Sequence, residues 1–123
     1  VHVQNGRFQA AIEELQKAVT FSGNAPRYIS LLGYGYARAG NKLEAQKRIE
    51  ELEQLRKRRF VDSGDIAIIY AGRGDKDQAF AWLDRAVEEG SLRLVYLKVL
   101  PAFDPIRTDP RFAALVRRLN FPP

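Results

Sequence analysis

The chain has 123 residues, of which 46% are hydrophobic and 28% charged, which excludes a disordered polymer and fits one small domain or three to four helical repeats. Cysteine is absent and His2 is the only histidine, so disulfides, Cys/His metal sites and histidine-based catalytic triads are excluded within one chain. The net charge of +5 lies in residues 1–59, which hold 11 Lys or Arg and 6 Asp or Glu, whereas residues 60–123 hold 9 of each.

The chain repeats itself with a period of 34 residues, which places Gly6, Gly40 and Gly74 in register. Around each glycine, apolar residues recur at i, i+4 and i+7, the spacing of one face of an α-helix. Each unit is therefore predicted to be a helix, a tight turn at the glycine and a second helix. The other positions in register are Ala11, Ala45 and Ala79; Leu15, Ile49 and Leu83; Ala18, Leu52 and Ala86; Leu32 and Ile66; and Tyr36 and Tyr70.

The first unit, residues 1–25, is predicted to be truncated. Its second helix covers roughly Phe8–Val19, Gly6 marks the corner before it, and residues 1–5 supply only a stub of the first helix. We therefore expect the chain to be a fragment of a longer protein. A helix without its hairpin partner exposes an apolar face, so self-association through this repeat is also expected.

The second unit, residues 26–59, is predicted to contain both helices. Leu32 belongs to the stripe of the first helix, and the small residue Gly33 is expected to face Ala45 across the hairpin. Gly40 supplies the left-handed residue of the corner. Asn41 is suited to cap a second helix that begins near Lys42 and is predicted to reach Arg59.

The third unit, residues 60–91, repeats this plan. Ile66, Ala67 and Tyr70 form the first stripe, Gly74 the corner, and Asp75 the expected cap of the second helix. Because single hairpins cannot bury both of their stripes, the units are predicted to stack into one continuous core.

Residues 92–123 break the period and are predicted to close the array. Leu92–Val99 is expected to form a short helix, and the prolines around Phe103–Arg107 predict a turn. Asp109 followed by Pro110 predicts the start of a final helix that ends near Asn120. The buried stripe of this helix is predicted to contain Phe112, Leu115, Val116 and Leu119.

The run Leu32-Gly33-x-x-Tyr36 with Gly40, Ala45, Ile49 and Leu52 resembles the tetratricopeptide repeat (TPR) family over roughly residues 1–91. The resemblance implies an all-α, right-handed α-α superhelix of helical hairpins with a closing C-terminal helix. It also implies a protein–protein interaction module. The motif Asp-Pro-x-Arg-x-Asp-Pro-Arg-Phe is similar to closing segments of TPR tails on large bacterial regulators and signalling kinases. This similarity implies that the chain is part of a larger signalling or regulatory protein.

In TPR-like arrays the first helices line a concave groove, so residues opposite their core stripes are the predicted binding residues. A partly apolar groove with charged edges suits a peptide or protein segment, although Leu31 and Tyr34 could instead pack against the neighbouring repeat. Tyr34 and Ile68 occupy the position where carboxylate-clamping TPR modules carry asparagine, so that clamp is not expected. The predicted groove residues are Arg27, Leu31, Tyr34 and Arg38 in the second unit and Val61, Asp65 and Ile68 in the third.

The basic run Arg56–Arg59 supports an alternative, the binding of nucleic acid or an acidic partner. The simpler interpretation is a solvated helix end, because cations complement the negative end of the helix dipole. A further alternative is a structural or self-associating unit without a groove ligand.

The sequence gives no indication of an enzyme. Asp104 and Asp109 are explained as capping residues of the closing turn, and no nucleophile, base or metal-ligand constellation accompanies them. No cofactor is therefore expected. No apolar run approaches the ~18 residues that cross a bilayer, so membrane insertion is not predicted. The sequence does not identify the compartment, and the cytoplasm is only slightly favoured.

Overall fold

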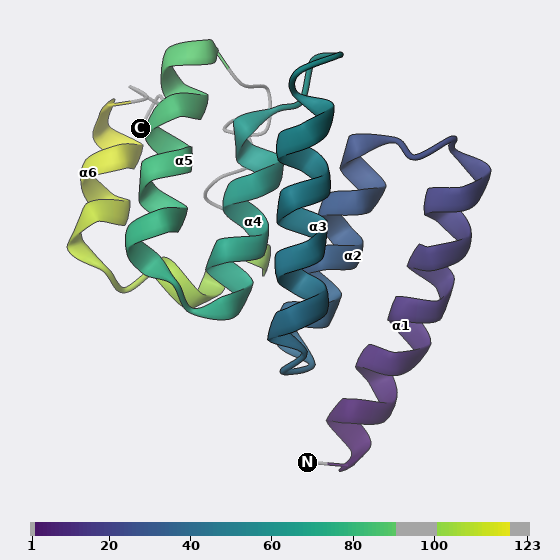
Figure 1. Cartoon of the computed structure of the whole chain (residues 1–123). Coiled ribbons are helices and arrows are strands. Elements are labelled where there is room, and N and C mark those ends of the chain that lie inside the picture. Colours follow the sequence, from purple (N-terminus) through teal and green to yellow (C-terminus); the bar gives the residue numbers. More distant parts are fainter. Residues whose placement is uncertain (1, 91–100, 119–123) are drawn as a thin grey trace.

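The computed structural model describes residues 2–90 and 101–118, and within them the chain is all-α with neighbouring helices packed antiparallel (Figure 1). No strand occurs in these residues. The elements are α1 (His2–Phe21), α2 (Pro26–Arg38), α3 (Lys42–Leu55), α4 (Ser63–Arg73), α5 (Lys76–Glu89), the 3-10 helix η2 (Pro101–Ile106) and α6 (Pro110–Arg118).

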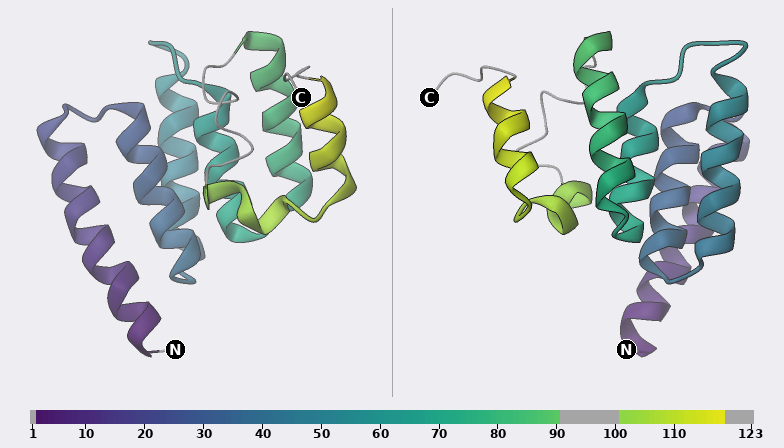
Figure 2. Two further views of the ribbon diagram at one scale, coloured as in Figure 1. Left: turned by 180° about the vertical axis from the view of Figure 1, so that it is seen from behind. Right: turned by 60° about the vertical axis from the view of Figure 1, so that its left-hand side comes forward.

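The helices follow one another across the molecule in chain order (Figures 1 and 2). α2 packs against α1, α3 and α4, and α4 packs in turn against α5 and η2. α6 lies outside α5 at the far end from α1. This arrangement leaves α1 and α6 as the two edges and puts α4 in the interior.

The two predicted corners at Gly40 and Gly74 are confirmed. Both glycines have a positive φ, 84° at Gly40 and 77° at Gly74, in the left-handed region that costs glycine little. Asn41 caps α3 as predicted, because its side-chain oxygen accepts a hydrogen bond of 3.2 Å from the backbone N–H of Glu44. Asp75 occupies the N-cap position of α5 without a side-chain capping bond.

The predicted corner at Gly6 is wrong. Gly6 lies inside α1, a continuous helix of 20 residues that begins well before the predicted start at Phe8. A glycine inside a helix costs about 1 kcal/mol relative to alanine, and a long helix can accommodate that cost. The register of 34 residues therefore continues into α1 without the corner that accompanies it in the later units.

The apolar stripes of α2–α5 form the core as predicted. The predicted stripe residues that are at most 3% exposed are Ile29, Leu32, Ala45, Ile49, Leu52, Ile66, Ala67, Ala79, Leu83 and Ala86. The stripe predicted for α1 is only partly buried, because Ala11 is exposed and Leu15 and Ala18 are half-buried. Ile12, which the register did not select, is only 3% exposed.

Gly33 permits a close approach, but not to the predicted neighbour. A Cβ atom at Gly33 would lie 2.5 Å from Cδ1 of Ile69 and 3.0 Å from Cβ of Arg48. The missing side chain therefore makes room for α4 and for Arg48 of α3, whereas Ala45 was the predicted contact.

The closing segment follows the prediction where it is described. The predicted turn is a 3-10 helix, η2, in which Phe103 and Ile106 are 0% exposed. Asp109 accepts a 2.9 Å hydrogen bond from the backbone N–H of Arg111 at the start of α6. The predicted helix Leu92–Val99 and the predicted helix end near Asn120 lie outside the described residues.

α6 joins α5 through apolar and ionic contacts. Phe112 and Leu115 are 8% and 2% exposed. Two ion pairs link the outer faces of the helices, Arg111 with Asp77 at 2.8 Å and Arg118 with Asp84 at 2.6 Å. Both partners of each pair remain largely accessible to solvent.

Candidate functional site

The α2 half of the predicted groove is a partly open surface. Arg27 and Arg38 are exposed at the two ends of the helix, and Leu31 and Tyr34 are half-buried between them. These four residues recur at i, i+4, i+7 and i+11, so they share one side of α2. We call them the α2 face.

The α4 half of the predicted groove is closed. Val61, Asp65 and Ile68 are only 3%, 2% and 3% exposed. The backbone carbonyl of Asp65 also accepts a 2.7 Å hydrogen bond from the hydroxyl of Ser30 on α2. Asp65 and Ile68 are therefore not available to a partner in this conformation, and Val61 contributes only a small edge to the surface.

The closing segment lies against α4 and approaches the α2 face. η2 packs on α4 (Figure 2), where Phe103 and Ile106 join the same core cluster as Ile68. Burial raises the pKa of the Tyr34 phenol; the Arg38 charge lowers this pKa, and the Asp104 charge raises it, with a raised pKa as the net result. Asp104 of η2 is therefore within electrostatic range of the α2 face.

Tyr34 connects the two halves physically. A Cβ atom at Gly72 of α4 would lie 2.7 Å from Cδ2 of Tyr34, so the tyrosine ring occupies the space above that glycine. One edge of Tyr34 is therefore fixed by α4, which limits how the exposed part of the ring can move.

The predicted helix end at Arg56–Arg59 needs correction. α3 ends at Leu55, after which the backbone tightens, with Lys57 N–H donating to the carbonyl of Gln54 and Arg58 N–H to that of Leu55. The four cations therefore lie in the turn between α3 and α4 rather than in the last turn of a helix.

Arg56 differs from the rest of the basic run because it is bound within the fold. Its guanidinium donates to Ser63 Oγ at 2.7 Å and pairs with Glu89 at 3.2 Å, and it lies 5.1 Å from the centroid of the Trp82 ring. Ser63 Oγ donates to Glu89 at 2.7 Å. Desolvation raises the pKa of Glu89, but the hydrogen bonds from Ser63 and Arg56 outweigh it and lower the pKa overall.

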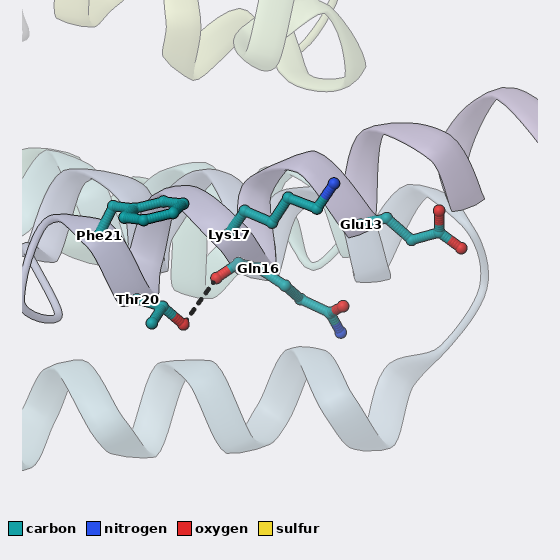
Figure 3. A pocket seen from close by; sticks show the side chains of 5 residues that line it. All are labelled: Glu13, Gln16, Lys17, Thr20 and Phe21. Carbon is teal, nitrogen blue, oxygen red and sulfur yellow. Dashed lines mark hydrogen bonds between the residues drawn. The ribbon is translucent and has the colours of Figure 1, made fainter.

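The surface of α1 carries a shallow depression of about 460 Å³ (Figure 3). Its lining comes from α1 alone, and Phe21 at its end is 88% exposed. Gln16 donates a 2.8 Å hydrogen bond to the Tyr36 hydroxyl, which links α1 to α2. Self-association through this helix stays a prediction. The lining residues are Glu13, Gln16, Lys17, Thr20 and Phe21.

The acidic residues of the closing segment have structural partners. Asp104 pairs with Arg107 at 2.6 Å, and Asp109 pairs with Arg111 at 2.9 Å, which lowers the pKa of Asp109 to about 2. Within residues 2–90 and 101–118, no group of three or more His, Cys, Asp or Glu side chains could hold a metal ion. None of the helices in the same ranges has the length and apolar character to cross a membrane.

Three comparisons place these observations beside known proteins. No protein family matches this sequence, and neither a curated protein nor a solved structure is significantly similar to it.

Sequence reasoning missed the partners of the basic run. Ser63 and Glu89 are 26 residues apart and meet only because the start of α4 lies beside the end of α5. It also overlooked Phe60, although a large apolar residue directly after four cations was a readable signal.

Proposed function

We propose that this chain is a TPR-like protein-interaction module, part of a larger signalling or regulatory protein, that binds a peptide or protein segment along the α2 face. The 34-residue register and the antiparallel pairs α2/α3 and α4/α5, with corners at Gly40 and Gly74, support the TPR-like part of the proposal. A right-handed superhelix is part of the same proposal.

The main support for the binding function is the exposure pattern of the α2 face. Leu31 and Tyr34 offer an apolar strip that is neither fully buried nor fully solvated, and Arg27 and Arg38 stand at its ends. Interfaces commonly have an apolar centre with a polar rim, and tyrosine and arginine are enriched among the residues that dominate binding energy. The strip is one helix long, which suits a short segment.

The expected partner carries acidic groups spaced to reach the two arginines. α2 rises about 1.5 Å per residue, so Arg27 and Arg38, 11 positions apart, are separated by about 16 Å along the helix axis. An extended segment of about five residues spans that length. A peptide with acidic residues near both ends and apolar residues between them matches the α2 face.

Selection from a random peptide library displayed on phage would test this proposal, followed by calorimetry of the selected peptide. Replacing both end residues, Arg27→Ala with Arg38→Ala, should weaken binding about tenfold, because these residues are exposed and the substitution should not disturb folding. Lys42→Ala with Lys47→Ala, two exposed residues on α3, is the matched control.

Tyr34→Ala provides a second measurement. It should weaken binding at least tenfold if the ring is a central contact, and circular dichroism must show that the variant remains folded. Selected peptides whose affinity is the same for the wild type and the arginine double variant would refute the assignment of the α2 face.

A further inference from the structure

The turn between α3 and α4 presents a second surface, which we call the α3–α4 corner and define as residues 56–61. The backbone N–H groups of Arg58 and Arg59 both donate to the carbonyl of Leu55, at 3.0 and 2.9 Å. This bonding folds the chain into a compact turn. The side chains of Lys57, Arg58 and Arg59 are exposed on it.

The outward charge of the corner comes from three residues. Arg56 is engaged by Ser63 and Glu89, as described above. Among the ion pairs between described residues, none involves Lys57, Arg58 or Arg59. Three adjacent cations that have no counter-charge among the described residues attract an anionic partner.

An apolar anchor point follows the cations directly. Phe60 is 75% exposed, and it borders a pocket of about 270 Å³ that is lined by Arg56, Arg59, Phe60, Val61 and Glu89. A volume of this size accommodates one side chain. A partner residue placed there would remove much of the Phe60 ring from water, which is favourable.

Glu89 makes the pocket selective. Its carboxylate is ionised at neutral pH and pairs with Arg56 at 3.2 Å, so the two charges match each other inside the pocket. An anionic group entering the pocket would therefore find the Arg56 charge already paired, so anionic groups are favoured at the rim with Lys57, Arg58 and Arg59, and an apolar group inside beside Phe60. The arrangement differs from a surface for single-stranded nucleic acid, where several aromatic rings stack successive bases.

We propose that the α3–α4 corner is a docking site for an acidic protein segment that places one aliphatic or aromatic side chain beside Phe60. The acidic residues of that segment flank the apolar residue and contact Lys57, Arg58 and Arg59. This site shares no residue with the α2 face, so the chain can hold two segments or two parts of one partner.

Fluorescence anisotropy with a labelled peptide, Glu-Asp-Glu-Leu-Glu-Asp-Glu, tests the site. Arg58→Glu with Arg59→Glu should weaken binding about tenfold by reversing two rim charges. Phe60→Ser should weaken it about fivefold by removing the apolar contact. Neither change involves a buried side chain, so folding should be retained, which circular dichroism would verify.

Three controls decide between the possible outcomes. Lys42→Glu with Arg117→Glu makes the same change in net charge at exposed positions elsewhere and should leave the affinity unchanged. A peptide with serine in place of leucine should bind about fivefold more weakly, and an oligothymidylate should bind more weakly than the acidic peptide. Any of three results would overturn the proposal. The serine peptide could bind as tightly as the leucine peptide, the control variant could lose as much affinity as the Arg58/Arg59 variant, or the oligothymidylate could bind more tightly than the acidic peptide.

Discussion

α2 and α4 occupy the same position in the 34-residue sequence register, yet one has an open side and the other does not. Every residue from Val61 to Ile69 is buried, whereas Arg27, Tyr28 and Arg38 of α2 are exposed. Both helices have antiparallel neighbours, and among the described elements η2 packs mainly against α4. The comparison shows that the first helix of a hairpin can be exposed, as α2 is, or buried, as α4 is. The outcome depends on whether another segment of the chain packs against the side that faces away from its hairpin partner.

Weakening the contact between η2 and α4 should have the largest effect on stability. Phe103→Ala deletes a 0% exposed ring from η2 and should lower the free energy of unfolding by about 3–5 kcal/mol. Phe60→Ala, at a ring that is 75% exposed, is the matched control and should cost less than about 0.5 kcal/mol. Urea unfolding followed by circular dichroism measures both. Equal losses in the two variants would show that η2 does not cover α4.

Shortening an apolar side chain to alanine should destabilise the fold more on α4 than on α2. Ile66→Ala on α4 removes a fully buried side chain and should destabilise the fold by about 3 kcal/mol, because a cavity remains. Leu31→Ala on α2 removes a half-buried one and should cost about 1 kcal/mol. The same unfolding measurement applies. A Leu31 variant as destabilised as the Ile66 variant would place the α2 face in the core.

The contact between the two helices can be tested at Gly72. In Gly72→Ala the new methyl group would lie 2.7 Å from the Tyr34 ring. Overpacking costs about 1–3 kcal/mol and the higher helix propensity of alanine offsets about 1, so a net loss of about 1 kcal/mol is expected. In a Tyr34→Ala background the substitution should cease to destabilise. Stabilisation by Gly72→Ala in the wild-type background would contradict this contact.

The smallest expected effect is on the ionisation of Tyr34. Its pKa should lie above the ordinary value of 10, and Asp104→Asn should lower it by removing a nearby negative charge. The difference in tyrosinate absorbance between each protein and its Tyr34→Phe variant isolates this residue during an alkaline titration. An unchanged Tyr34 pKa in the Asp104 variant would place η2 outside electrostatic range of α2.

The same shift has a defined consequence for stability. Because the folded pKa of Tyr34 is raised above the unfolded value, the folded state retains the phenol proton more strongly. The contribution is fully present below about pH 10 and is lost as the pH rises through the folded pKa. Tyr34→Phe should therefore lose stability less steeply than the wild type at alkaline pH.

Much of the fold of α2–α5 was readable from the sequence because the constraints are local. Gly40 and Gly74 meet a need for positive φ that few other residues satisfy, and residues such as Ile49 and Leu83 lie on one face by helical periodicity alone. At Gly6 the same pattern misled, since a glycine permits a left-handed corner without requiring one.

The candidate site was less predictable because it depends on distant parts of the chain. Ile68 follows the groove pattern, but it is buried in the same core cluster as Phe103 and Ile106 of η2, more than 30 residues later. Val61, also buried, lies instead beside Phe60 and Glu89 at the other end of α4. Likewise, Arg56 looks equivalent to its three basic neighbours in the sequence. Its partner Glu89 is 33 residues away, so its internal role becomes evident only once α5 is in place.

The ion pairs between α5 and α6 should make one end of the molecule more sensitive to salt concentration than the rest. Arg111 with Asp77 and Arg118 with Asp84 are accessible to dissolved ions, and the screening length falls from about 10 Å at 0.1 M salt to about 3 Å at 1 M. Added salt should weaken both pairs while leaving the apolar contacts of Leu115 intact. The attachment of α6 to α5 should therefore vary with ionic strength, whereas the apolar packing of α2 against α4 should not share that dependence.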